Sequence, residues 1–211
     1  MKKTSTWLVP VFGLLATALA AAQSTPTYAG KPYNGKPLAI PGTIQAEEYD
    51  ISPNAANDVT FHYKGTPKKS PNRTSPDSIM VAGFGSGHVS TDGKPEDPKQ
   101  VYVGWTQPGE WLKYTVQVDQ PGTYVFGGKM SAGGKGAKIS ATFAPSSITT
   151  GPVEIPTTAG FQPGVEVYHV WETLDKLAEV KLPAGTYVMT IKIESPNAGM
   201  NFDYFTFTKK P

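Results

Sequence analysis

Glycine and proline interrupt this chain so often that they restrict the fold to short extended segments joined by turns. The 211 residues include 22 glycines and 20 prolines, together about 20% of the chain, against a usual share of about 12%. Proline removes a backbone donor and glycine weakens a helix interior, so neither is tolerated within a long helix. We therefore expect turns and β-strands to dominate, without long amphipathic helices.

Alternation of apolar and polar residues marks three half-buried strands. In 111–118 the even positions are apolar and most odd positions are polar, and 187–193 alternates in the same way after a Pro-Ala-Gly turn. A third β-rich stretch covers 202–207. Shorter candidates are 43–49, 59–63, 101–105, 123–129, 138–143, 167–171 and 178–182. Many short strands separated by turn signals predict an all-β fold, an antiparallel β-sandwich.

The N-terminus has the order of a secretory signal. Lys2 and Lys3 precede an apolar run that ends in small residues at 18–22. The run is short for a membrane span, which needs about 20 residues. We therefore expect a signal peptide at 1–22, export to the periplasm or the medium, and no membrane span. Residues 23–40 lack periodicity and are expected to be a flexible leader, which leaves 41–211 as one domain.

Charge and cysteine content exclude several functions. Nineteen basic and 17 acidic side chains give a net charge of +2, and no basic cluster is longer than the pair Lys68 and Lys69. A nucleic-acid partner is therefore not expected. The absence of cysteine removes disulfides, thiolate metal sites and cysteine nucleophiles. Core packing or an oxygen-liganded ion must hold the fold together.

No catalytic motif is recognisable. The glycine-rich segment 83–87 does not match a nucleophile elbow, and the three histidines are too dispersed for a zinc pattern. A small glycoside hydrolase or polysaccharide lyase could use Glu110 with Glu166 or Glu172. Sequence alone does not place two carboxylates at the separation of about 5 or 6.5–9.5 Å that glycoside hydrolysis needs. An enzyme therefore stays an open alternative without direct support.

Three widely spaced segments carry a family resemblance. They are 44–49 (IQAEEY), 103–114 (VGWTQPGEWLKY) and 201–205 (NFDYF). In this order they resemble the family 6 carbohydrate-binding modules, with family 35 as the near neighbour. Segments 121–124, 170–173 and 182–186 agree in the same order. The resemblance covers about 41–208, nearly all of the expected mature chain.

The resemblance implies a lectin-like jelly-roll sandwich with a structural calcium ion. By position, the calcium ligands are Gln45, Glu47 and Asp203. Calcium takes six to eight oxygen ligands, and an ion shared by the first and last strands would join them without disulfides. Alternation would place Gln45 and Glu47 on the same strand face. The alternative is that both acids are ordinary carboxylates at strand ends.

The resemblance also implies a sugar cleft formed by loops at one end of the sandwich. Trp105 and Tyr168 match the two aromatic residues that enclose a pyranose ring, and Asn201 matches the asparagine that binds its hydroxyls. Phe161 could replace Tyr168 as the second wall. Glu110 is a further candidate, for contacts to sugar hydroxyls or to the loop backbone. Trp105 could instead be a core residue, and Asn201 could cap a turn.

These residues predict a non-catalytic protein that binds a polysaccharide or oligosaccharide and acts as a monomer. The enzyme described above is one alternative class. An adhesion module whose end loops bind protein is another.

Overall fold

The computed structural model describes residues 27–53, 56–65, 70, 73, 81–196 and 199–211. The expected signal peptide, 1–22, lies outside these ranges. Within them the chain forms two β-sheets and short 3-10 turns, without an α-helix. Over the same ranges, no helix has the length and apolar character needed to cross a membrane.

One sheet has seven strands. Its path runs β1, β7, β13, β9 and β10, while β3 pairs with β7 and β11 pairs with β9. Neighbouring strands are antiparallel except β1 and β7, which are parallel. The bounds are β1 Leu38–Ile40, β3 Phe61–His62, β7 Trp111–Val118, β9 Ala137–Ala144, β10 Ile148–Thr149, β11 Val153–Ile155 and β13 Gly185–Ile193.

The second sheet also has seven strands, in the order β4, β6, β14, β8, β12 and β5, with β2 paired to β14. Only β5 and β12 are parallel. The bounds are β2 Gly42–Gln45, β4 Val81–Gly83, β5 Val89–Ser90, β6 Val101–Val103, β8 Gly122–Ala132, β12 Val170–Leu182 and β14 Met200–Lys209. The all-β sandwich predicted from the sequence is confirmed.

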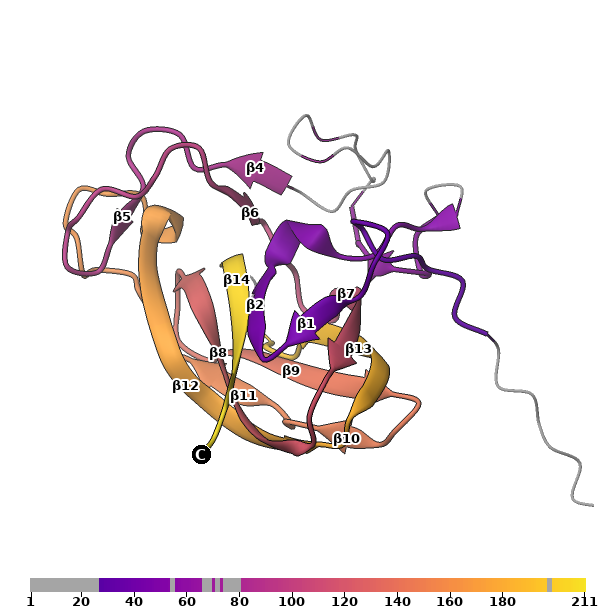
Figure 1. Ribbon diagram of the computed structural model, residues 1–211. Coiled ribbons are helices and arrows are strands. Elements are labelled where there is room, and N and C mark those ends of the chain that lie inside the picture. The colour runs from indigo at the N-terminus through magenta and orange to yellow at the C-terminus, as the bar shows by residue number, and fades with distance from the viewer. Residues whose placement is uncertain (1–26, 54–55, 66–69, 71–72, 74–80, 197–198) are drawn as a thin grey trace, which may run out of the picture.

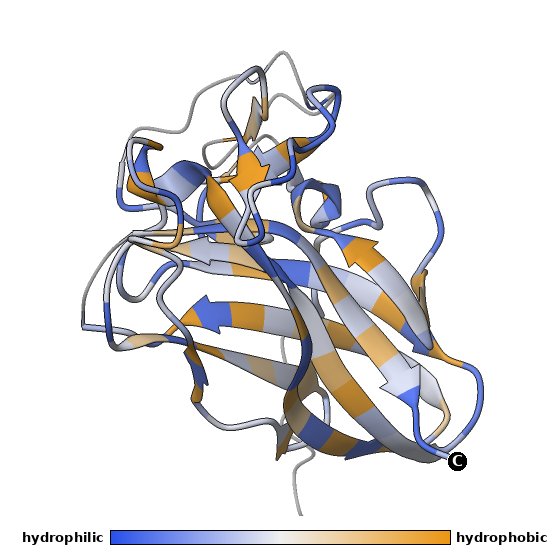
Figure 2. Ribbon diagram, turned by 90° about the vertical axis from the view of Figure 1, so that its left-hand side faces the viewer, coloured by the Kyte–Doolittle hydropathy of each residue, from blue (hydrophilic) through white to orange (hydrophobic). Residues whose placement is uncertain are grey.

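The core lies between the sheets and follows the alternation read from the sequence. Figure 2 shows hydrophobic and hydrophilic bands alternating along the strands. On β7, every second residue from Leu112 to Val118 is buried, and β13 alternates in the same way from Tyr187 to Ile193. Phe205 and Phe207 of β14 are buried against Phe126, at centroid distances of 6.1 and 5.1 Å. The predicted strands at 111–118, 187–193 and 202–207 are therefore confirmed.

The ordered fold begins before residue 41. Leu38 pairs with Val116 in the parallel register of β1 and β7, and Ile40 is fully buried. Lys31 and Ile51 exchange backbone hydrogen bonds of 3.0 and 2.7 Å. The described part of 23–40 therefore differs from the flexible leader that we expected. Burial of Ile40, together with pairing to a strand far along the chain, explains the difference.

The strand expected at 43–49 ends early. It stops at Gln45 and continues as a 3-10 turn, η1, over Ala46–Glu48. Tyr114 donates its hydroxyl to the carbonyl of Ala46 at 2.8 Å, and Arg73 donates to the carbonyl of Glu47. These tertiary hydrogen bonds favour the turn over the strand. Gln45 and Glu47 consequently do not share a strand face, which corrects that part of the prediction.

The loops that form the site gather at one end of the second sheet. There, Ala132 at the end of β8 pairs with Met200 at the start of β14, and Met130 pairs with Glu172 near the start of β12. A second 3-10 turn, η3 at Val167–His169, leads directly into β12. Figure 1 shows this end of β12 beside β5, opposite the end that holds the C-terminus. The strand expected at 167–171 therefore begins only at Val170.

Candidate functional site

A cavity of about 560 Å³ lies at this end of the sandwich. This volume is within the usual range of ligand sites. Four aromatic side chains line it: Tyr63, Tyr102, Trp105 and Tyr168. Asn201 lines it as well, so three of the four residues predicted for sugar binding meet here although they come from separate chain segments.

Trp105 presents its ring to solvent and to the cavity. Its exposed fraction is 54%, so the alternative of a core residue is wrong. The ring stacks on Tyr102 at a centroid distance of 6.0 Å and an interplanar angle of 24°. Its φ is 52°, in the left-handed region that is costly for a residue with a side chain. Strain of this kind gathers at functional sites, because surrounding contacts must maintain it.

Asn201 connects the two predicted aromatic walls. It is buried, and its Oδ1 accepts the backbone N–H of Trp105 at 3.2 Å. Its Nδ2 donates to the carbonyl of Tyr168 at 3.0 Å. A carboxamide offers two donor hydrogens and two lone pairs, so half of this capacity is used to position Trp105 and Tyr168. Asn201 therefore has a positioning role that the sequence did not reveal.

Two glycines accommodate the ring of Tyr168. A Cβ atom at Gly133 would lie 2.2 Å from its Cε1, and one at Gly199 would lie 2.5 Å from its hydroxyl oxygen. Any side chain at either position would displace the ring. The carbonyl of Tyr168 also accepts the hydroxyl of Ser131 at 2.8 Å. The sequence contained these glycines, but nothing local marked them as neighbours of Tyr168.

A second aromatic cluster supports the cavity from below. Phe84 stacks on Trp171 at 4.5 Å, and Tyr102 meets Trp171 edge-on at 5.3 Å. Trp171 is fully buried. Because Tyr102 also stacks on Trp105, this cluster extends the hydrophobic interior up to the exposed ring.

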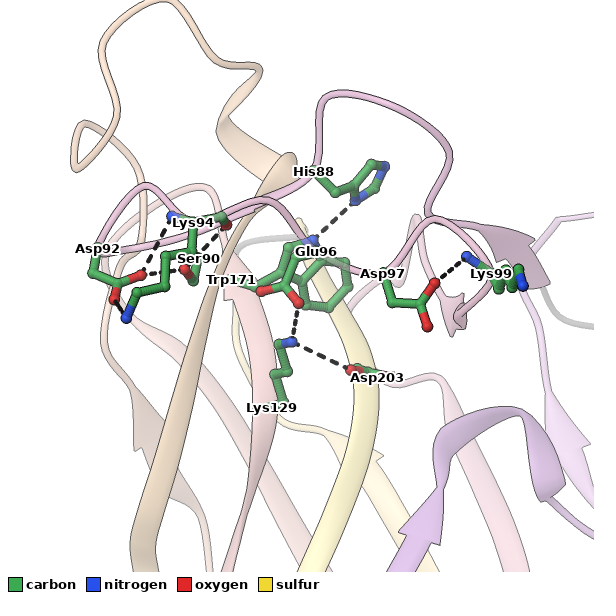
Figure 3. Close-up of polar contacts among 10 residues, drawn as sticks. All are labelled: His88, Ser90, Asp92, Lys94, Glu96, Asp97, Lys99, Lys129, Trp171 and Asp203. Atoms are coloured by element: carbon green, nitrogen blue, oxygen red, sulfur yellow. Dashed lines mark hydrogen bonds and ion pairs between the residues drawn. The ribbon is translucent and has the colours of Figure 1, made fainter.

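His88 belongs to the same cluster and is buried as a neutral ring. The indole Nε1 of Trp171 donates to its Nδ1 at 2.9 Å (Figure 3). An indole N–H can only donate, so the proton of His88 sits on Nε2. Burial, followed by the neighbouring His169, lowers the pKa of His88 to about 4. His169 stacks on His88 at 3.9 Å and lines the cavity, which the sequence did not indicate.

Of the two roles considered for Glu110, the structure shows contacts to the loop backbone, and Glu110 does not line the cavity. It is fully buried, and its two oxygens accept the backbone N–H groups of Lys64 and Gln107, both at 2.9 Å. Burial raises the pKa of Glu110, and these hydrogen bonds oppose the increase. Glu110 therefore holds together the turn that follows Trp105.

Phe161 lies elsewhere. It is 57% exposed and lines a separate cavity of about 350 Å³, together with Asp92 and Glu172. It is therefore not the second wall of the larger cavity. The carboxylates of this second cavity already have partners: Ser90 and Lys94 contact Asp92, and Thr91 donates to Glu172.

The carboxylate pairs that an enzyme could use are separated. Glu166 lines the larger cavity, Glu172 lines the smaller one, and Glu110 lines neither. In the part of the chain that the structure describes, Glu166 is the one carboxylate among the lining residues of the larger cavity.

The predicted calcium ligands lie beside the junction of β2 and β14. Gln45 pairs with Tyr204 across these strands. The register shifts between Phe202 and Tyr204, and this irregularity turns Asp203 into the interior, where it is fully buried. Neither oxygen of Asp203 has a hydrogen bond, and Oε2 of Glu47 is equally unpaired.

Both Glu47 and Asp203 have a raised pKa. Burial raises the pKa of Glu47 to about 7, with smaller contributions from the charges of Glu48 and then Asp203, and burial raises the pKa of Asp203 to about 6. Lys129 contacts Glu96 and lies 3.8 Å from Oδ2 of Asp203 (Figure 3). Buried carboxylate oxygens without hydrogen bonds suit a hard cation. Among the described residues, however, no cluster of three or more His, Cys, Asp or Glu side chains has the arrangement of a metal site. The remaining oxygens would have to come from Gln45, carbonyls or water.

Fold and cavity together define a lectin-like class, a β-sandwich with an aromatic-lined cavity among its end loops. The chain belongs to family 6 of the carbohydrate-binding modules, whose family model matches residues 82–209. The predicted family is thereby confirmed, and the matched range includes the segments 103–114 and 201–205, whereas 44–49 lies before it. The matched range contains Trp105, Tyr168, Asn201 and Asp203.

Solved structures agree with this fold. A module of Cellvibrio mixtus lichenase 5A in complex with cellotriose is 20% identical, with a TM-score of 0.50 over 81% of this chain and 98% of the module. A β-1,3-glucan-binding family 6 module from Bacillus halodurans is 19% identical, with a TM-score of 0.51 over 82% of this chain and 98% of that one. The C-terminal family 6 module of LamC from Zobellia galactanivorans is 19% identical, with a TM-score of 0.50 over 80% and 98%. No curated protein matches the chain.

Proposed function

We propose that this protein binds a polysaccharide or oligosaccharide in the larger cavity without cleaving it. The observation that carries the proposal is the convergence of Trp105 and Tyr168 on one cavity, with Asn201 hydrogen-bonded to the backbone of both. Family membership supports carbohydrate as the ligand class.

Aromatic packing supplies the main affinity in this proposal. The C–H face of a sugar ring packs on an aromatic ring, and an exposed tryptophan offers a large rigid surface. The exposed ring of Trp105 therefore forms one wall, and Tyr168 forms the other. The remaining donor and lone pair of Asn201 orient the sugar through its hydroxyls.

The absence of catalysis rests on the positions of the carboxylates. Glu110, Glu166 and Glu172 occupy three different environments, so the pairs that we considered do not meet. This arrangement supports binding over hydrolysis. We expect the purified protein to release no reducing sugar from a polysaccharide that it binds.

Calcium and export complete the proposal. Glu47, Asp203 and Gln45 would hold a structural calcium ion, which would neutralise buried negative charge and join β2 to β14. The N-terminal segment 1–22 would direct the protein to the periplasm or the medium, where it would act as a monomer. N-terminal sequencing and sedimentation of the mature protein test these two points.

A pair of aromatic substitutions tests the function. Affinity electrophoresis would use cello- and laminari-type glucans, the ligand classes named for two of the similar structures. Trp105→Ala should weaken retention by about 1–3 kcal/mol. Phe161→Ala removes an equally exposed ring from the other cavity and should leave retention unchanged. Equal retention of the wild type and Trp105→Ala would contradict the proposed site.

A further inference from the structure

The larger cavity has a charge pattern that bears on which saccharides it accepts. Among its lining residues, Glu166 is the one carboxylate and there is no lysine or arginine within the described ranges. Lys64 reaches the turn at Gly109 but does not line the cavity. From the described part of the chain, a ligand that enters the cavity therefore meets one negative charge and no lysine or arginine.

Glu166 is held at the rim while remaining accessible. Its Oε2 accepts the backbone N–H of Tyr168 at 3.1 Å, which caps the η3 turn. The side chain is 49% exposed, so ligand hydroxyls can still reach the carboxylate. Tyr168, the proposed aromatic wall, belongs to this capped turn. The cap therefore fixes the position of the Glu166 carboxylate relative to Tyr168.

Among the lining residues that the structure describes, the one histidine, His169, lies near Glu166. Nε2 of His169 lies 3.5 Å from Oε2 of Glu166. Tyr102 also lines the cavity. Burial raises the pKa of Tyr102, and the charge of Glu166 raises it further. The negative charge of Glu166 therefore acts across the cavity.

We propose that Glu166 makes this cavity selective for neutral saccharides, by accepting hydrogen bonds from sugar hydroxyls and repelling carboxylate- or sulfate-bearing sugars. This inference rests on the proposed function and specifies its ligand class. A carboxylate has only acceptor sites, so it suits hydroxyl donors and cannot pair with a uronate at neutral pH. In a partly solvated site, one carboxylate of the protein next to a negative charge on the sugar lowers affinity by about three- to tenfold.

Matched polymers test the proposal directly. Hydroxyethyl cellulose with carboxymethyl cellulose, and laminarin with carboxymethylated laminarin, are pairs that share a backbone but differ in charge. In affinity electrophoresis at pH 7.5 and low salt, the wild type should bind the neutral member at least threefold more tightly. Glu166→Gln should reduce that preference by about three- to tenfold, and salt should reduce the wild-type preference as well.

A control variant distinguishes the effect of the Glu166 charge from the effect of the protein's net charge. Glu154→Gln removes an exposed carboxylate from β11, outside both cavities, and should leave the preference unchanged. An unchanged thermal midpoint for Glu166→Gln would show that η3 is intact, because glutamine can still accept from Tyr168. If Glu166→Gln kept the wild-type preference while Trp105→Ala lost binding, the proposed function would stand and this inference would fail. If the wild type bound neither neutral polymer, both would fail.

Discussion

The backbone N–H of Trp105 donates to Oδ1 of Asn201 at 3.2 Å, although 96 positions separate the two residues. The pairing of β6 with β14, at Val103 and Phe202, brings them together. The exposed ring thus depends on a contact that only the assembled sheet provides.

At position 105, a glycine variant should be more stable than an alanine variant. At ordinary positions glycine costs about 0.5–1 kcal/mol relative to alanine, but φ at Trp105 is 52°. A left-handed conformation costs a residue with a Cβ atom about 1–2 kcal/mol. Trp105→Gly should therefore unfold at higher denaturant than Trp105→Ala, by about 0.5–1 kcal/mol, while both lose saccharide binding.

The neighbouring Gln107 provides the control, because it does not have a positive φ. There, the alanine variant should be the more stable of the two. If alanine were also preferred at position 105, the left-handed strain would not exist in solution.

Asn201→Ala should impair binding more than Ser131→Ala. Both side chains donate to the carbonyl of Tyr168, but only Asn201 also accepts from Trp105. Loss of a buried hydrogen-bond partner costs about 1–3 kcal/mol. Titration calorimetry should show affinity reduced by about this amount in Asn201→Ala, with a clearly smaller reduction in Ser131→Ala. Equal reductions would mean that the contact to Trp105 does not contribute.

Calcium should stabilise the protein through Asp203. A ligand at 100 times its dissociation constant adds about 2.7 kcal/mol, which raises the thermal midpoint by several degrees in a domain of this size. EDTA should reverse the increase. Asp203→Asn should abolish the response to calcium, whereas Asp97→Asn, in the loop before β6, should preserve it. A wild-type midpoint independent of calcium and EDTA would contradict the structural ion.

His88 should make the protein less stable as pH falls from 7 to 4.5. Its pKa is lowered from 6.5 to about 4 in the folded state, so the unfolded state binds more protons throughout this interval. Stability therefore falls on acidification, by about 2 kcal/mol from this group. Urea unfolding at several pH values measures the slope.

The variant His88→Gln tests this prediction, because glutamine can still accept the hydrogen bond from Trp171 but does not titrate. His88→Gln should therefore lose less stability than the wild type, or gain more, between pH 7 and 4.5. The same slope in wild type and His88→Gln would refute this account of His88.

Local pattern determined the strands and the identity of several site residues. The alternation over Trp111–Val118 recorded which side chains face the interior, since burial imposes a period of two on any half-buried strand. The resemblance of the motifs around Trp105 and Asn201 to a known family implied that both belong to one site, and both line the larger cavity.

Tertiary structure decided what the loops do. Glu110 turns inward because the N–H of Lys64, 46 positions away, needs an acceptor. The chain leaves its strand after Gln45 because Tyr114 binds the carbonyl of Ala46. Periodicity in a sequence reports burial within one segment, whereas a loop conformation depends on hydrogen bonds to distant segments, and no local pattern records these.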